Sequence, residues 1–129
     1  MLFPADLKYS KEHAWVRATG AEAVVGITDH AQKELGDIVF VEAPQVGTVL
    51  TQLKTFGVVE SVKSVSDLHA PVSGTVTRVN DVLAATPEIV NKDPYGAGWM
   101  IALALKDPKE LDGLMTEGEY EAYVGEIGK

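Results

Sequence analysis

The chain has 129 residues, a length that suits one domain, and 46% of them are hydrophobic, as is usual for a chain that folds around a core. Its formal charge of −8, with only 11 lysines and arginines, argues against nucleic-acid binding and favours partners with basic docking faces. Because cysteine is absent, disulfides, thiolate metal sites and cysteine nucleophiles are excluded, and any thiol chemistry must come from a cofactor.

No segment reaches the roughly 18 to 20 consecutive apolar residues that a membrane span requires. Residues 1–10 include Pro4, Asp6 and Lys8, which do not suit the apolar centre of a signal peptide. We therefore expect a cytoplasmic protein that binds no membrane. A location in the mitochondrial matrix would require that a transit peptide has already been removed.

The first third of the chain predicts a hairpin, a short helix and a strand. Residues 15–18 and 22–27 have the composition of short strands, and Gly20 suits the turn between them. Residues 28–36 begin with capping residues and end with glycine, which indicates one or two helical turns. Residues 37–42 are rich in β-favouring side chains and stop before a proline, so we expect a well-buried strand.

The middle of the chain, residues 47–79, consists of short apolar runs interrupted by Gly, Pro, Ser and Asp. This spacing is typical of a compact β-sandwich or barrel. The tripeptide Gly-Thr-Val occurs at 47–49 and again at 74–76, on either side of Lys63. Two related halves are one interpretation, and a chance match of three residues is the other.

The last part of the chain predicts a loop, a strand and two helices. Residues 80–98 are rich in turn-forming residues, whereas residues 99–105 indicate a final strand. Residues 107–127 contain two capping patterns, each of which begins a short helix. The last helix carries an apolar stripe formed by Tyr120, Tyr123, Val124 and Ile127. We expect this stripe to cover one edge of the β-core rather than to bind a partner.

Lys63 is the candidate functional residue. β-prone runs on both sides place it at the tip of a hairpin, where an enzyme that modifies lysines could reach it. Val62 is expected to fold back and fix the turn, and Glu60 and Asp67 offer carboxylates near the tip. Spacing alone does not distinguish this lysine from an ordinary solvated one.

The residues around Lys63 resemble the lipoylation signature of glycine cleavage H proteins, and three further blocks extend this resemblance over most of the chain. The signature comprises residues 60–63, 66–67 and 70–74, and the further blocks are residues 26–32, 35–42 and 90–99. The resemblance implies one lipoyl-carrier domain over residues 1–129, mainly β, with a hybrid barrel-sandwich fold. Its lipoyl-bearing hairpin core would span about 37–80, a short helix would precede the core, and C-terminal helices would span about 107–127.

In this family a lipoyl-attaching enzyme joins lipoate by an amide bond to the hairpin lysine, which the resemblance identifies as Lys63. The carrier is not itself an enzyme. It accepts an aminomethyl group from the P-protein, presents it to the T-protein, and passes electrons to the L-protein. We expect the chain to be a monomer with these partners.

One departure from the family pattern is the triplet His13-Ala14-Trp15, where family members commonly have His-Glu-Trp. The resemblance implies that a glutamate at this position helps to hold the loaded arm in a surface cleft. Asp67 remains for this role, and Glu12 would point to the same face as Ala14 in an extended segment, as a weak substitute. The sequence therefore predicts weaker retention of the loaded intermediate.

Several alternatives stay open. Ala14 suggests a carrier that relays lipoyl groups to other acceptors, and an unmodified interaction module would keep the same fold. A biotin carrier would place methionines on both sides of Lys63, which this chain does not. His13, His30 and His69 match no compact metal motif, and the serines lack the context of a hydrolase nucleophile.

Overall fold

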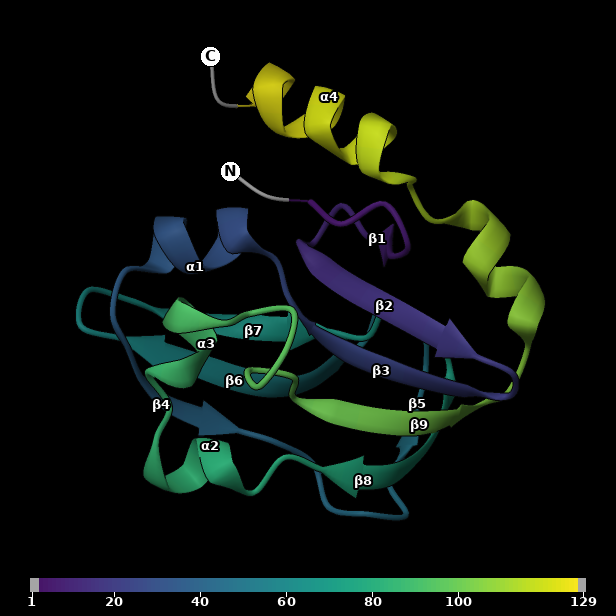
Figure 1. Cartoon of the computed structure of the whole chain (residues 1–129). Coiled ribbons are helices and arrows are strands. Elements are labelled where there is room, and N and C mark those ends of the chain that lie inside the picture. Colours follow the sequence, from purple (N-terminus) through teal and green to yellow (C-terminus); the bar gives the residue numbers. More distant parts are fainter. Residues whose placement is uncertain (1–2, 128–129) are drawn as a thin grey trace.

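The computed structural model describes residues 3–127, so the outermost residues of the expected 1–129 domain lie outside the description. The chain forms two antiparallel sheets, with α1 and the β6–β7 loop at one end and α4 along one edge (Figure 1). The larger sheet has the strand order β1-β2-β3-β9-β8-β5, and the smaller has the order β4-β6-β7. A mainly β fold with helices in the expected parts of the chain is confirmed.

The strands are β1 (Lys8–Tyr9), β2 (Ala14–Thr19), β3 (Glu22–Ile27), β4 (Ile38–Glu42), β5 (Val49–Leu50), β6 (Thr55–Ser61), β7 (Val65–His69), β8 (Gly74–Val79) and β9 (Ile101–Leu105). The helices are α1 (Asp29–Leu35), α2 (Val82–Ala85), α3 (Ile89–Lys92), the 3₁₀ helix η1 (Pro108–Gly113) and α4 (Glu117–Ile127). Among residues 3–127, no helix is long and apolar enough to span a bilayer.

The helix predicted over residues 28–36 is confirmed, and both of its ends have clear physical causes. The side-chain oxygen of Thr28 accepts the N–H of Ala31 at 3.2 Å, which caps the first turn. At the other end, Gly36 has a φ of 81°, and its N–H donates to the carbonyl of Gln32. Glycine adopts this left-handed backbone without steric cost, so the chain can leave the helix sharply here.

The expectation that residues 37–42 form a well-buried strand is wrong in one respect. The strand exists as β4, but Val39 is 53% exposed and Phe40 is 46% exposed. Two features of β4 explain this exposure. It is an edge strand of the three-stranded sheet, and its register against β6 shifts between Ile38 and Phe40.

The expectation of a loop over residues 80–98 is also incomplete, because α2 and α3 lie within it. Each helix has only four residues, too few for an apolar period to appear in the sequence. They are held instead by burial of Leu83 and Val90 against the smaller sheet. The two-residue strand β1 was similarly too short to predict.

The two helices expected over residues 107–127 are present, and the first is a 3₁₀ helix. The capping box of the second is confirmed, since Glu119 accepts the N–H of Thr116 at 2.9 Å and Thr116 accepts the N–H of Glu119 at 3.3 Å. Tyr120 is fully buried and its ring stacks on that of Tyr9, with centroids 4.8 Å apart. Helix α4 therefore covers the edge strand β1, as expected, while Ile127 stays 46% exposed.

Three groups of buried apolar side chains form the core. One group, which includes Val72, lines a face of the larger sheet. The second lies between the smaller sheet and helices α1 to α3, and it includes Val59 and Val90. The third lies beneath α4, where Trp15 and Tyr120 are both fully buried. The Trp15 Nε1–H donates to the carbonyl of Pro94 at 2.9 Å, which fixes the indole ring.

Gly26 gives a test of how tightly this third group is packed. A β-carbon at Gly26 would lie 2.7 Å from two carbons of the Trp15 ring, which cannot move without losing its hydrogen bond. We expect Gly26→Ala to lower the free energy of unfolding by about 1–3 kcal/mol. Gly125→Ala on the open surface of α4 is the control, and it should raise that free energy by up to about 1 kcal/mol. Equal effects of both changes in urea unfolding would contradict the packing described.

Candidate functional site

Lys63 lies at the tip of the β6–β7 hairpin, and its side chain is exposed. Residues 61–64 form the turn. The hydroxyl oxygen of Ser61 accepts the N–H of Lys63 at 3.3 Å and the N–H of Ser64 at 3.1 Å, and the N–H of Ser61 donates to the carbonyl of Ser64 at 2.8 Å. A serine hydroxyl therefore fixes the turn, and sequence reasoning missed this role although serine is a common turn residue.

The expected role of Val62 is wrong. Its side chain is 68% exposed and does not fold back under the turn. Instead its backbone N–H donates to the carbonyl of Asp37 at 3.0 Å, which joins the turn to the segment that begins β4. Glu60 lies opposite Val65 in the hairpin register and is half-buried, so it is close to the tip as expected.

The aliphatic stem of Lys63 passes over Gly36. A β-carbon at Gly36 would lie 3.5 Å from Lys63 Cε and 3.9 Å from Cδ. The link from α1 to β4 is itself held by Asn91 of α3, whose amide nitrogen donates to the carbonyl of Gly36 at 2.9 Å. The same side chain accepts the N–H of Ile38 at 2.8 Å. Asn91 thus positions the surface on which the lysine stem lies, a role that its place in an expected loop did not reveal.

A cavity of about 140 Å³ lies beside this hairpin, between α1, β6 and β7. Its lining combines apolar side chains with three carboxylates and a histidine. The lining residues are Glu12, His13, Ile27, Ala31, Glu34, Leu35, Val59, Ser66, Asp67 and Leu68. Of the residues predicted from the sequence, Asp67 and Glu12 are brought together here, whereas Glu60 and Val62 are not part of the lining.

Glu12 and Ala14 do not share a face, contrary to the expectation for an extended segment. His13, between them, has a φ of 66°, and this left-handed residue breaks the alternation of an extended chain. Ala14 is 5% exposed and packs in the apolar group that includes Val16 and Val72. Glu12 lines the cavity, and its Oε2 lies 3.8 Å from Nδ1 of His69.

His13 links the cavity to the C-terminal helix. Its Nδ1 lies 2.7 Å from the hydroxyl of Tyr120, which also hydrogen-bonds with Thr28 Oγ1 at 2.7 Å. The ring of His30 lies 4.8 Å from that of His13. Burial lowers the pKa of His13 below its ordinary value, and the His30 ring lowers it further, against the opposing effect of Glu12 and Glu34. His13 is therefore held in its neutral form more strongly than a free histidine.

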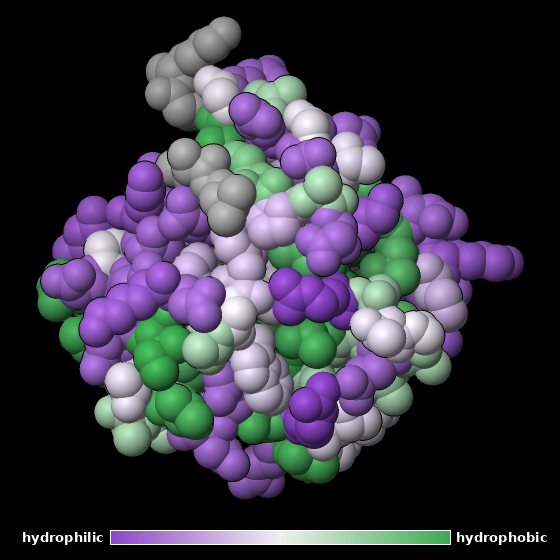
Figure 2. Space-filling view, in the orientation of Figure 1, coloured by the Kyte–Doolittle hydropathy of each residue, from purple (hydrophilic) through white to green (hydrophobic). Residues whose placement is uncertain are grey.

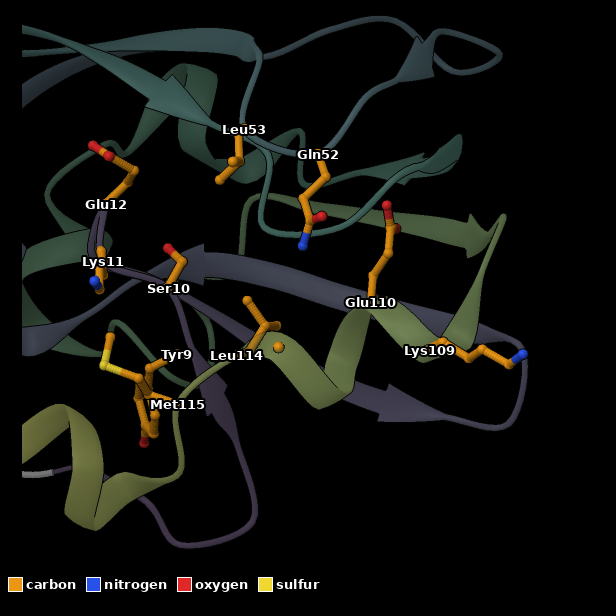
Figure 3. A pocket seen from close by; sticks show the side chains of 11 residues that line it. Tyr9, Ser10, Lys11, Glu12, Gln52, Leu53, Lys109, Glu110, Leu114 and Met115 are labelled. Carbon is orange, nitrogen blue, oxygen red and sulfur yellow. The ribbon is translucent and has the colours of Figure 1, made fainter.

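A second, larger cavity of about 480 Å³ lies between residues 9–12, the segment before β6 and the η1 region (Figure 3). Figure 3 shows the Glu12 carboxylate turned away from Leu114 and Gln52. Glu110, which reaches into this region, is engaged by Ser73, because its two carboxylate oxygens accept the Ser73 N–H at 2.7 Å and hydroxyl at 2.9 Å. Glu12 is the one sequence-predicted site residue that lines it.

The histidines do not assemble a metal site in the part of the chain that the structure describes. No group of three or more histidine or acidic side chains among residues 3–127 is arranged to hold a metal ion. His13 and His30 are close together, but the nearest acidic partner of His69 is Glu12, with Nδ1 3.8 Å from its Oε2.

The lowered pKa of His13 predicts a pH dependence of stability. As the pH falls below 6.5, the unfolded state takes up a proton at this histidine before the folded state does. The free energy of unfolding should therefore fall from pH 6.5 downwards until the folded-state pKa is passed. His13→Asn, which tolerates the left-handed backbone, should reduce this fall, as measured by urea unfolding across the pH range. A variant with the same slope as the wild type would refute this origin of the pH dependence.

Comparisons with known proteins agree with this architecture. The family model described as glycine cleavage H-protein matches residues 7–127. A glycine cleavage system H protein from Symbiobacterium thermophilum is 56% identical over 123 residues, which cover 95% of this chain and 96% of that protein. The protein of the same name from Myxococcus xanthus is 53% identical over 119 residues, with 92% of each chain covered.

A solved structure supports the same assignment. The crystal structure of a glycine cleavage system H protein from Mycobacterium marinum superposes with a TM-score of 0.81 at 38% sequence identity. The match covers 98% of this chain and 100% of that one, and it confirms the fold expected from the resemblance. The chain belongs to the glycine cleavage H-protein family.

Proposed function

We propose that the chain is the lipoyl carrier of a glycine cleavage system, with lipoate joined by an amide bond to Lys63. In this role it takes an aminomethyl group from the P-protein to the T-protein and electrons to the L-protein. When attached, the lipoyl group would supply the disulfide that accepts the aminomethyl group, and it would be left as a dithiol after that group has been transferred. The chain supplies the tether and the docking surfaces, and its partners supply the catalysis. The observation that carries the proposal is an exposed lysine at the tip of a fixed turn in a chain of this family.

The position of Lys63 suits amide formation. The amine must lose a proton before its nitrogen attacks the carbonyl carbon of an activated lipoyl group, and the leaving group departs with the electrons of the broken bond. Lys63 is exposed and lies outside the packed core, so an attaching enzyme can enclose the amine without unfolding the carrier. The stem already lies against Gly36, which directs it along the α1 side of the hairpin.

The neighbouring cavity of about 140 Å³ suits the cargo and the arm. An aminomethyl group is cationic when protonated, and the carboxylates of Glu12, Glu34 and Asp67 line the cavity. Leu35 and Leu68 give it an apolar part that fits an aliphatic stem. Weaker retention because of Ala14 stays a prediction, and Glu12 is the residue through which the chain would compensate for it.

The attachment site is tested by intact mass after incubation with a lipoate–protein ligase, lipoate and ATP. Lys63→Arg keeps the positive charge but removes the amine, so this variant should gain no lipoyl mass. Lys33→Arg, at another exposed lysine on α1, should gain the same increment as the wild type. A lipoyl group on the Lys63→Arg variant would overturn the assignment.

The holding role of the cavity is tested by the spontaneous loss of methylamine from the loaded carrier. Glu12→Gln removes a partly exposed carboxylate, which should weaken the contact with the cation by up to about 1 kcal/mol and speed the loss about fivefold. Glu88→Gln removes the same charge at an exposed position outside the cavity and should change the rate little. Equal rates in both variants would show that Glu12 does not hold the cargo.

A further inference from the structure

Large apolar side chains are exposed around the hairpin that presents Lys63. Among residues 3–127, nine large apolar side chains are well exposed, and four of them lie in or beside this hairpin. These four, which we call the Phe40 patch, are Val39 (53% exposed), Phe40 (46%), Val62 (68%) and Val65 (65%). In Figure 2 apolar atoms reach the surface at the left margin, where Figure 1 places the β6–β7 loop. Exposed apolar side chains that lie together on a folded chain are a signal of an interaction site, whereas single ones are not.

The register of the smaller sheet places part of this patch in one row. Phe40 of β4 lies opposite Glu60 of β6, and Glu60 lies opposite Val65 of β7. Val59, the residue before Glu60, is buried in the core. Because successive side chains of a strand point to opposite faces, this row faces away from the core. Phe40 and Val65 therefore flank Glu60 on the outer face of the sheet.

The Phe40 patch and the lysine turn are held together by the backbone. Val62 donates its N–H to the carbonyl of Asp37 at 3.0 Å, which ties the turn to the start of β4. The turn itself is fixed by the Ser61 hydroxyl. A partner that binds the patch would therefore meet Lys63 at a constant position, with little ordering cost on binding.

The charges around the patch are acidic. Asp37 lies immediately before β4, Glu42 is the last residue of β4, and Glu60 lies on β6. In the described part of the chain, the ion pairs are His69–Glu12 and Arg78–Glu22, so these three carboxylates have no ion-pair partner there. Carboxylates that are covered on binding need cationic partners, because an unpaired charge is costly to bury. The patch therefore fits a partner with an apolar centre and a basic rim.

We propose that the Phe40 patch is the docking surface for the enzyme that attaches lipoate to Lys63, an inference that rests on the proposed function. That enzyme must bring the activated carbonyl to Lys63 Nζ itself, so its surface must cover the residues next to the turn. The other partners act on the distal end of the arm, many bonds from the backbone. In the attachment step, the Nζ–C bond forms, the bond from the carbonyl carbon to the adenylate oxygen breaks, AMP leaves with that electron pair, and the amine proton passes to solvent.

The test compares lipoylation rates of two double variants over a range of carrier concentrations, with lipoate–protein ligase and saturating lipoate and ATP. Phe40→Thr with Val65→Thr removes apolar surface from the patch but keeps residues that favour strands. Val46→Thr with Val49→Thr removes exposed apolar surface elsewhere and is the matched control. The first pair should raise KM for the carrier about thirtyfold and leave kcat unchanged, and the control should change neither.

Two further measurements separate docking from other roles. Val62→Thr, in the turn and outside the strand pairing, should raise KM as well, and this holds even if the double variant folds poorly. The inference would be overturned if both double variants had the wild-type KM for lipoylation. It would also be overturned if the patch variant were lipoylated normally and, once lipoylated, were slower only in aminomethyl transfer by the P-protein. A wild-type chain that accepts no lipoyl group on Lys63 would instead refute the proposed function.

Discussion

The position of Lys63 depends on four backbone N–H groups, those of residues 61–64, each of which has a hydrogen-bond partner. The N–H groups of Lys63 and Ser64 donate to the Ser61 hydroxyl, and the N–H of Ser61 donates to the carbonyl of Ser64. The N–H of Val62 donates to the carbonyl of Asp37. An exposed turn with unpaired N–H groups would be free to change conformation, whereas this one has a single hydrogen-bonded arrangement. The lysine is thus exposed to solvent yet carried by a fixed backbone, which suits both modification by an enzyme and the swing of a long arm.

The surroundings of the turn are tied to distant parts of the chain. Asn91 of α3 holds both the end of α1 and the start of β4, so the short helices that follow β8 support the surface beneath the lysine stem. The Tyr120 hydroxyl joins α4 to His13 and to the cap of α1. Both contacts converge on α1, which forms one wall of the cavity that we propose for the loaded arm. The C-terminal helix, far from Lys63 in the chain, therefore helps to shape the site.

Much of this arrangement could be predicted from sequence because it depends on local patterns. The strands over residues 22–27, the α1 cap at Thr28 and the Thr116–Glu119 capping box follow from residue types a few positions apart. The errors fall where distant contacts or single backbone angles decide the outcome. A left-handed His13 could not be read from its neighbours, although it separates Glu12 from Ala14.

The same limit applies to the site. An accessible lysine in a hairpin was predictable, and the family resemblance alone gave it a chemical meaning. The side chain of Val62 was expected to pack inward because it is apolar, but the core ends at Val59 and leaves Val62 in solvent. The two copies of Gly-Thr-Val lie side by side, because β5 pairs with β8. Gly47 has a φ of 94°, a left-handed backbone conformation that favours glycine. At Gly74 the carbonyl of Ala104 lies so close that a β-carbon would clash with it. The two glycines serve different purposes, and the origin of the repeat in two related halves stays a prediction.

The central claim is that Lys63 is the tether of the lipoyl arm. The most direct measurement is peptide mapping by mass spectrometry of the protein isolated from its native source. This account predicts one lipoyl group, carried by the peptide that contains Lys63, and none on any other lysine. A native protein without a lipoyl group, or with one at a different lysine, would contradict it.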